Sequence, residues 1–168
     1  MLSFIPSGAL TVQKQLDHVR DFHRHIGATV AGAPVLLPYE PTSARALARN
    51  LRGLCQTGAG NRGQGDDLVN RALMAVEELA EWIEAHVAGD LTAAADAWAD
   101  RCYLLFGDAV ATGLGTEAVF DEVHRSNMTK APVDPATGKA VKSDGYLAPV
   151  ISLDAADEPG RLKHSASG

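Results

Sequence analysis

Carboxylate side chains crowd two consecutive stretches of this chain, at spacings that suit the binding of a metal ion. They are Glu77, Glu78, Glu81, Glu84, Asp96 and Asp100. At about 100° per residue, Glu77, Glu81 and Glu84 share one edge of a helix, with Glu78 further round it, and the two aspartates share an edge of the next helix. Carboxylates that converge in a partly buried groove repel one another and lose hydration, and a hard divalent cation such as Mg²⁺ offsets both costs. The spacing therefore predicts a magnesium site where the two acidic edges meet.

A solvated acidic helix face is the alternative interpretation of this charge. Glutamates at helical spacing usually form such a face, which needs no ligand. Arg71 and Arg101 are the only basic residues within the two helices, so the helices themselves supply few cations to balance the acids. This shortage favours the metal site over the solvated face.

Five segments carry the signals of helices that would position these carboxylates. Apolar residues recur at helical spacing in residues 11–27, 42–55, 66–89, 90–113 and 116–130. The short link between the third and fourth segments favours antiparallel packing. A proline- and glycine-punctuated connector, a glycine-rich break and a turn-rich C-terminal part that suits a hairpin or an ordered loop make up the rest. The chain is therefore predicted to be all-α, an antiparallel helical bundle of about four to five helices with an irregular C-terminal segment.

Capping residues and apolar stripes predict where each helix ends and which face it buries. Gly27, Gly89 and Gly113 are expected as C-terminal stops. N-caps are expected at Thr42 or Ser43, at Asp66 or Asp67, at Asp90 or Thr92, and at Thr116. The predicted inward faces are Leu47, Leu51 and Leu54 in the second helix, and Ala95, Ala99, Cys102, Phe106 and Ala109 in the fourth.

Composition and charge argue against several classes of protein. The net charge of −6 and the isoelectric point near 5.4 disfavour non-specific nucleic-acid binding, which needs a basic surface. Two cysteines without a CxxC motif predict a reducing, cytoplasmic environment. The N-terminus lacks a basic, apolar leader, and no run of about 18 apolar residues predicts a membrane-spanning helix. The "GAGNRG" of residues 58–63 matches GxGxxG, but a helix precedes it and no βαβ pattern surrounds it, so a loop between helices is expected.

Several of these motifs together resemble one enzyme family. "EELAE", "DAWADRCYLLFG" and "FDEVHRSNMTKA" follow one another in the order found in the MazG-like, all-α nucleoside triphosphate pyrophosphohydrolases. The upstream "VRDFHRHIG" and the later "GKAVKSDGYLAP" are similar to segments of the family's dUTP-hydrolysing and phage-type members. The resemblance spans about residues 17–149 and predicts one pyrophosphohydrolase domain over residues 1–150, followed by a mobile tail over 151–168.

The resemblance implies a set of metal ligands. The family's EExxE element corresponds to Glu77, Glu78 and Glu81, of which Glu78 and Glu81 are also the expected catalytic carboxylates. The family's second element, ExxD, ends at Asp100, but its glutamate is replaced by Ala97. Asp96, one residue earlier, offers a carboxylate in its place. The expected cofactor is Mg²⁺, with Mn²⁺ as a possible substitute.

The resemblance also implies a substrate and an assembly. Asn127 and Lys130 of "SNMTK" would bind nucleotide, and Lys142 and Tyr146, with Lys139 as a further candidate, would add contacts. The implied reaction converts a nucleoside triphosphate, dUTP among the candidates, into the monophosphate and pyrophosphate. Members of the family form homodimers or homotetramers, and the same is expected here.

Two other functions stay open at this point. Phosphoribosyl-ATP pyrophosphohydrolase shares the fold and the metal chemistry, although the N-terminal helix and "SNMTK" favour the nucleotide house-cleaning enzymes. A non-catalytic helical oligomerisation or regulatory module is the other candidate. This candidate is supported by Ala97, which occupies the position of a metal-binding glutamate in the family pattern.

Overall fold

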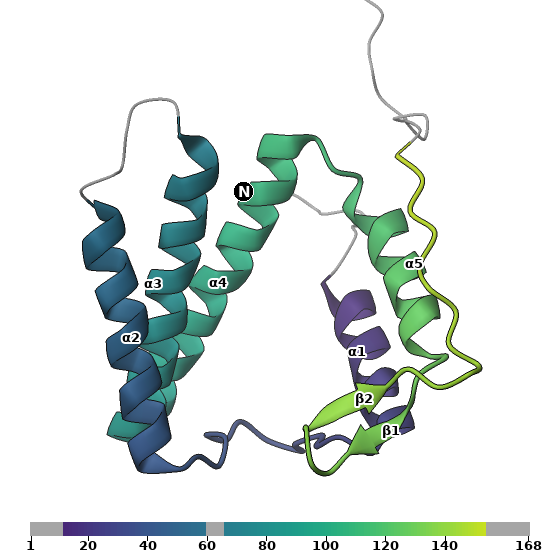
Figure 1. The fold of residues 1–168 in the computed structure, drawn as a ribbon, viewed down its shortest axis with the longest axis horizontal. Coiled ribbons are helices and arrows are strands. Elements are labelled where there is room, and N and C mark those ends of the chain that lie inside the picture. The colour runs from purple at the N-terminus through teal and green to yellow at the C-terminus, as the bar shows by residue number, and fades with distance from the viewer. Residues whose placement is uncertain (1–11, 60–65, 154–168) are drawn as a thin grey trace, which may run out of the picture. The chain divides into compact units, whose positions relative to one another are not determined.

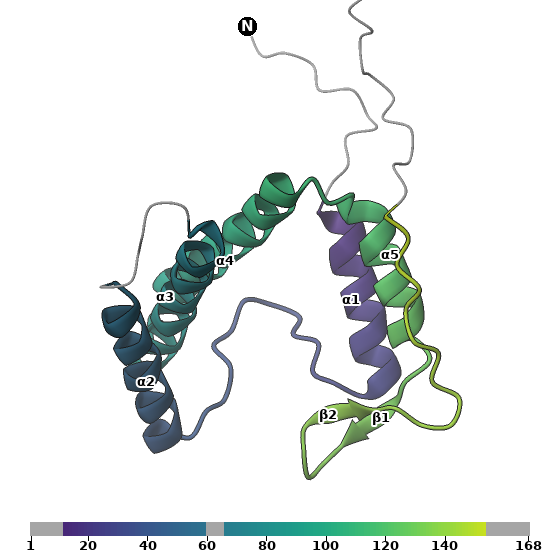
Figure 2. The same cartoon turned by 45° about the horizontal axis from the view of Figure 1, so that its top comes forward.

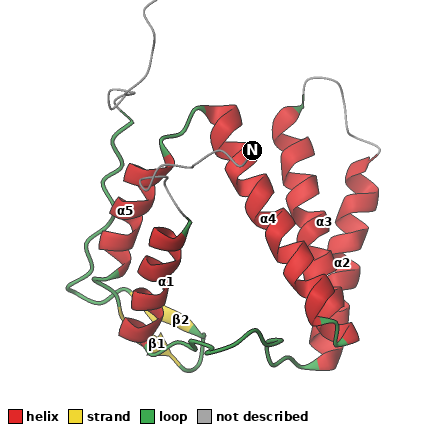
Figure 3. Ribbon diagram, turned by 180° about the vertical axis from the view of Figure 1, so that it is seen from behind, coloured by secondary structure: helices red, strands yellow, loops and turns green. Residues whose placement is uncertain are grey.

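A computed structural model describes residues 12–59 and 66–153 of the protein. Five helices and one short hairpin are found there (Figures 1 and 3). The elements are α1 (Gln13–Ile26), α2 (Pro41–Ala59), α3 (Asp67–Ala88), α4 (Leu91–Thr112), α5 (Thr116–Asn127), β1 (Ala131–Asp134) and β2 (Lys139–Val141). The predicted all-α class, with its irregular C-terminal segment, is confirmed. The chain divides into two compact units.

The first unit, Ala31–Leu114, contains α2, α3 and α4 together with the connector that precedes α2. The three helices run up, down and up, and α3 packs against both of its neighbours (Figure 1). Only Gly89 and Asp90 separate α3 from α4, so the two helices must turn back on each other, as the short link predicted.

Small side chains form the core of this unit. Its buried apolar residues are Ala48, Ala80, Ile83, Ala85, Ala94, Ala97 and Ala109. Because the distance between packed helices depends on the side chains at their contact, alanines allow the backbones to approach closely. At Gly58 of α2, an added Cβ would lie 2.5 Å from a methyl carbon of Leu73 in α3, so this position requires glycine or a displaced leucine.

Several predicted inward faces are wrong. Leu47 and Leu54 of α2 are exposed, and so are Ala95, Ala99 and Phe106 of α4. The contact between α3 and α4 uses the alanines at positions 94 and 97 instead. When a helix has apolar residues on most sides, periodicity does not identify the face that is buried. Which face is buried depends on how the neighbouring helix packs against it.

The second unit contains α1, α5, the hairpin and the segment that follows it. Helices α1 and α5 lie side by side, and the β1–β2 hairpin follows α5 directly (Figures 1 and 2). The hairpin turn is closed by the backbone N–H of Gly138, which donates to the carbonyl of Asp134 at 2.8 Å. Gly138 has φ of 66°, a left-handed conformation that glycine adopts at little cost. The hairpin that the turn-rich sequence suggested is therefore present.

Most predicted helix ends are confirmed. Gly27, Gly89 and Gly113 end their helices with φ between 69° and 75°. The Asp66 carboxylate accepts a hydrogen bond from the N–H of Val69 at 3.1 Å, and Asp90 caps α4 in the same manner. No side-chain hydrogen bond caps α5, whose N-cap is Gly115, so the prediction of Thr116 is wrong.

Helix α2 begins and ends differently from its prediction. Its N-terminal cap is Glu40, whose carboxylate accepts from the N–H groups of Thr42 at 2.9 Å and Ser43 at 2.7 Å. Pro41 then occupies the first helical position, where its missing N–H has no cost. The helix continues to Ala59, beyond the predicted break at Gln56, because its last turns pack against α3.

Two predicted features lie outside the described residues. They are residues 60–63 of the loop predicted at 58–63, which include Arg62, and residues 154–168 of the predicted mobile tail. Over the described ranges, none of the helices combines the length and apolar character that crossing a membrane requires.

The Glu40 cap makes stability depend on pH. Its two backbone hydrogen bonds lower the pKa of Glu40 from 4.5 to about 2. A carboxylate with a depressed pKa contributes stability above its unfolded-state pKa, and loses it as pH falls through the folded-state value. We expect Glu40→Gln to lower the free energy of unfolding at pH 7, and the gap to wild type to close between pH 4.5 and 2. Denaturant titrations across that range measure this. Asp144→Asn, which removes an exposed carboxylate without such bonds, serves as the control and should leave no gap.

Candidate active site

Glu78 stands at the centre of the predicted carboxylate group. Burial raises the pKa of this carboxyl group, and the negative charges of four neighbours raise it further. These neighbours are Glu81, Asp100, Glu77 and Asp96. The atom Oε2 of Glu78 is buried and has no hydrogen-bond partner among the described residues. Helices α3 and α4 thus bring all five predicted metal ligands within electrostatic range of one another.

The edge of α3 that faces α4 differs from the predicted one. Glu81 and Glu84 turn towards α2, where the Arg52 guanidinium lies 3.5 Å from Oε1 of Glu81 and 2.6 Å from Oε2 of Glu84. Glu78, which was expected to lie further round the helix, is instead the residue on which Asp96 and Asp100 of α4 act. The positive charge that balances Glu81 and Glu84 is therefore that of Arg52, on a third helix. Counting the basic residues of α3 and α4 alone could not reveal it.

The basic residues of α3 and α4 are engaged elsewhere. Arg71 of α3 pairs with Asp108 of α4 at 3.3 Å, and the Arg101 guanidinium lies 4.9 Å from the centre of the Trp82 ring. Arg52 therefore has the closest basic side chain to Glu81 and Glu84 that the described residues show. Exposed ion pairs contribute only about 0.2–1 kcal/mol. The longer Arg52–Glu81 contact is accordingly cheap to break when another cation binds.

Ala97 occupies the position where the family pattern has a glutamate. Its side chain is 5% exposed and lies in the contact with α3, whereas Asp96 and Asp100 on either side of it are exposed. A glutamate at position 97 would have to bury its carboxyl group. The alanine allows close packing, and Asp96 approaches the group from the solvent side.

The donor set fits a hard divalent cation in its chemistry. All five side chains offer carboxylate oxygens, the ligands that Mg²⁺ prefers. The buried Oε2 atom of Glu78 has no hydrogen-bond partner within residues 12–59 and 66–153. In their present rotamers, no three acidic, histidine or cysteine side chains of the described residues are grouped closely enough to hold a metal ion. Binding a cation would therefore require these side chains to move together.

An apolar cavity of about 360 Å³ lies beside the second turn of α4. Residues 34–37 of the connector form one wall, and Trp82, His86 and Trp98 form part of the rest. His86 is buried and packs edge-on against Trp82 at 4.5 Å between ring centres. Trp82 and Trp98 thus line a concave surface of the α2–α4 unit.

The predicted nucleotide-binding residues belong to the other unit. The Lys142 ammonium lies 4.8 Å from the centre of the Tyr146 ring, and Lys130 lies 5.9 Å from that of Phe22. A hydrogen bond with Ser126 lowers the pKa of the Tyr146 hydroxyl, and the charges of Lys142 and Lys130 add to this effect. Lys130, Lys142 and Tyr146 therefore lie close together, and we call them the cationic group because its two lysines are positively charged. Asn127 ends α5 directly beside it, and its carbonyl accepts from the N–H of Lys130 at 3.0 Å.

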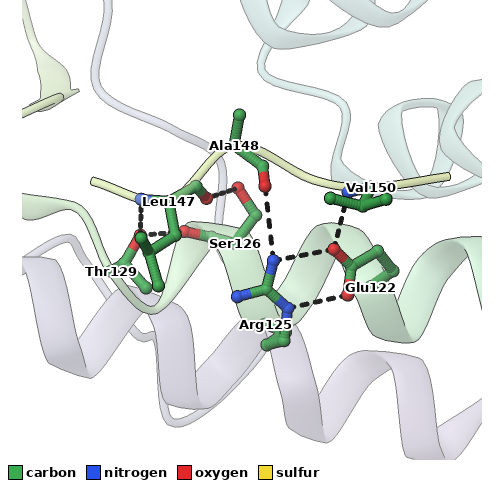
Figure 4. A network of polar contacts seen from close by, with 7 residues as sticks. All are labelled: Glu122, Arg125, Ser126, Thr129, Leu147, Ala148 and Val150. Carbon is green, nitrogen blue, oxygen red and sulfur yellow. Dashed lines mark hydrogen bonds and ion pairs between the residues drawn. The ribbon is translucent and has the colours of Figure 1, made fainter.

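A polar network on α5 holds the segment that carries Tyr146 (Figure 4). The buried Ser126 hydroxyl donates to the carbonyl of Leu147 at 2.7 Å, and the Leu147 N–H donates to Thr129 Oγ1 at 2.9 Å. One turn earlier, Glu122 accepts from the N–H of Val150 at 2.7 Å. Two residues of the "SNMTK" motif, Ser126 and Thr129, thus have a structural role that its nucleotide-binding interpretation missed.

Arg125 completes this network. It pairs with Glu122 through two hydrogen bonds of 2.7 Å and donates to the carbonyl of Ala148 at 3.3 Å. The Arg125 pair and the Val150 N–H together lower the pKa of Glu122 to about 2. We call residues 146–150 the C-terminal strap. Its backbone is bound by side chains of α5 in place of a neighbouring strand, which the turn-rich sequence gave no means of predicting.

Comparison with known proteins finds a match to a family model over part of the chain. Residues 59–127 match the family model of phosphoribosyl-ATP pyrophosphohydrolase, a family of the MazG-like all-α superfamily. The matched segment contains all the predicted metal ligands. Neither the curated proteins nor the solved structures gave a significant match.

The network predicts that Glu122 protects the strap. We expect Glu122→Ala to speed exchange of the Val150 amide hydrogen by roughly tenfold, because a charge-assisted hydrogen bond is lost. The Leu147 amide, which donates to Thr129, should change less. Amide exchange followed by NMR measures both positions. Glu117→Ala removes a glutamate of the same helix that pairs with Lys14 instead, and is the matched control. Unchanged exchange at Val150 would show that the strap does not depend on Glu122.

Proposed function

Because residues 59–127 match a family of the MazG-like all-α pyrophosphohydrolase superfamily, we propose that the protein hydrolyses a nucleoside triphosphate to the monophosphate and pyrophosphate. The family match over residues 59–127 supports the general activity, that of a pyrophosphohydrolase. The substrate class, with dUTP as a candidate, rests on the resemblance of the motifs outside the matched segment. The single observation that carries the proposal is the group of carboxylates around the partly buried Glu78.

The proposed cofactor is Mg²⁺, which Mn²⁺ can replace. Glu77, Glu78, Glu81, Asp96 and Asp100 would hold it, since the other four carboxylates all act on Glu78 from α3 and α4. When bound, the ion would neutralise phosphate charge and orient the attacking water. Glu81 becomes available for this role by giving up its long contact with Arg52, which remains bound to Glu84 through two shorter hydrogen bonds.

Glu78 is the proposed proton acceptor in the reaction. Burial raises the pKa of its carboxyl group. A carboxylate oxygen of Glu78 that does not contact the ion would accept the proton. It would take a proton from the water whose oxygen attacks the α-phosphorus. The bond between that phosphorus and the α–β bridging oxygen then breaks, and pyrophosphate leaves with the bonding electrons. Glu81 would share the task of positioning this water.

The cationic group of Lys130, Lys142 and Tyr146 is proposed to bind the substrate, together with Asn127. Ammonium groups stabilise negative phosphate oxygens, and the strap fixes Tyr146 next to Ser126. Lys139 is exposed on β2 and remains a further candidate.

We also propose that the protein forms a homodimer or homotetramer. Large apolar side chains of α4 are exposed to an unusual extent, with Tyr103 at 79% and Val110 at 84%. Exposed apolar surface of this kind commonly marks an interface. The free thiols of Cys55 and Cys102 are consistent with the proposed cytoplasmic location.

The proposed function predicts magnesium-dependent release of pyrophosphate. The wild-type protein is incubated with a panel of nucleotides that includes dUTP, the other deoxynucleotides and phosphoribosyl-ATP, with and without Mg²⁺. We expect Glu81→Gln to abolish turnover. Glu84→Gln, which removes the other partner of the same arginine, should retain turnover at saturating substrate. Release from phosphoribosyl-ATP alone would favour that substrate, and no release from any nucleotide would favour a non-catalytic module.

A second prediction concerns the ligand that departs from the family pattern. We expect both Asp96→Asn and Asp100→Asn to lower turnover by at least about a hundredfold, because each removes stabilisation of charge at the reacting phosphate. Titration of the rate with Mg²⁺ should shift to higher concentration in both variants. If Asp96→Asn keeps the wild-type rate and magnesium dependence while Asp100→Asn is inactive, Asp96 is a surface residue and not a ligand.

A further inference from the structure

A second concave surface of the α2–α4 unit is lined by arginines. It is a groove of about 570 Å³ between α2 and α3. Its lining residues are Arg45, Ala48, Arg49, Arg52, Gly53, Gln56, Glu84, Val87 and Ala88. The three arginines are spaced by four and three residues, which places them along a single face of α2. This groove is distinct from the cavity beside the tryptophans.

The charge of the groove is unbalanced. Arg52 is paired with Glu84, the only acidic residue of the lining. Arg45 and Arg49 form no ion pair with any residue that the structure describes. The lining therefore carries two uncompensated positive charges, in a chain whose net charge is −6. Such a concave site favours an anionic ligand, whose negative charge the guanidinium groups can bind.

The arginines of the groove, rather than its largely apolar floor, suit phosphate groups. Guanidinium groups match phosphate oxygens in geometry and bind them through paired hydrogen bonds. At Gly53, which follows Arg52, an added Cβ would meet no atom within 4 Å, so a ligand has open space beside the helix there. The paired hydrogen bonds between Arg52 and Glu84, at 3.0 and 2.6 Å, hold one guanidinium in place before any ligand binds. Less conformational entropy is then lost when it contacts an anion.

Arg52 connects this groove to the carboxylate group. The same guanidinium that lines the groove lies 3.5 Å from Glu81, one of the proposed metal ligands. A phosphate chain whose reacting end lies at the carboxylates can therefore extend into the groove past Arg52. Arg49 and Arg45 follow at successive turns of α2, in a row leading away from the carboxylates.

We propose that the α2 arginines bind the terminal phosphates of the substrate and so select a triphosphate over a diphosphate. That the anion is a nucleoside triphosphate rests on the proposed function. That Arg45 and Arg49 bind a phosphate chain is independent of the proposed function. The alternative occupant is an acidic segment of a second copy of the chain, which the oligomeric state of the variants would reveal.

Inorganic tripolyphosphate provides a test that does not depend on catalysis. Its binding to the full-length protein is measured by calorimetry in the presence of EDTA, so that no metal contributes. The double variant Arg45→Ala, Arg49→Ala should bind at least about tenfold more weakly, since charged hydrogen bonds are lost. The control is Arg20→Ala, Arg24→Ala, which removes two positive charges four residues apart from α1, where each is paired with an aspartate. Both double variants change the net charge equally.

The outcomes separate specific binding in the groove from non-specific attraction and from self-association. Loss of affinity in the α2 variant alone supports the proposal. Absence of binding to wild type, or equal loss in both variants, overturns it. Sedimentation velocity is run on the same samples. If the α2 variant dissociates into smaller species and wild type binds no tripolyphosphate, the groove holds a second copy and the proposal is wrong.

Kinetics then test the selection of triphosphate. The ratio of kcat/KM for a nucleoside triphosphate to that for its diphosphate should fall by about tenfold in the α2 double variant, and stay unchanged in the α1 control. An unchanged ratio would overturn the selective role. If wild type binds tripolyphosphate through the arginines but hydrolyses no nucleotide, the groove is an anion site and the proposed enzymatic function is the part that fails.

Discussion

The close packing of α3 against α4 through alanine side chains is the constraint on which the candidate active site depends. Ala80, Ala94 and Ala97 are buried in this unit, and their small size lets the two backbones approach. Glu78 is thereby partly removed from water, within electrostatic range of four other carboxylates. Larger residues at these positions would separate the helices and let each carboxylate hydrate independently. The electrostatic strain of the site is thus a consequence of steric packing.

In the α2–α4 unit, arginines on one helix balance the charges of acidic side chains on another. Arg52 reaches from α2 to Glu81 and Glu84, and Arg71 reaches from α3 to Asp108. Glu78 has no such partner for its buried oxygen among the residues that the structure describes. A buried carboxylate oxygen without a positive partner is costly, and proteins retain such groups mainly where a ligand or a reaction uses them. The unbalanced arginines of α2 and the unpartnered oxygen of Glu78 are therefore complementary features of one unit, one suited to an anion and the other to a cation.

The second unit shows how one short motif combines structural and binding roles. Within "SNMTK", Ser126 and Thr129 hold the strap, while Asn127 and Lys130 are candidates for nucleotide binding. Because adjacent residues of a helix point in different directions, neighbouring positions can serve the interior and the ligand. The strap in turn places Tyr146 next to Lys142 and Ser126. The position of Tyr146 within this group therefore depends on the hydrogen bonds of the strap.

Local patterns along the chain were enough to predict the helical class, most of the helix ends and the set of acidic residues. Helix periodicity, and caps such as Asp66, Asp90 and Gly89, act over a few residues and need no knowledge of the rest of the molecule. Contacts between helices, in contrast, determine that Ala97 rather than Ala95 is buried, that Glu78 rather than Glu81 faces α4, and that Arg52 pairs with Glu84. Each of these depends on which face of one helix meets another, and a helix that is apolar on several sides leaves that choice to the packing of its neighbours.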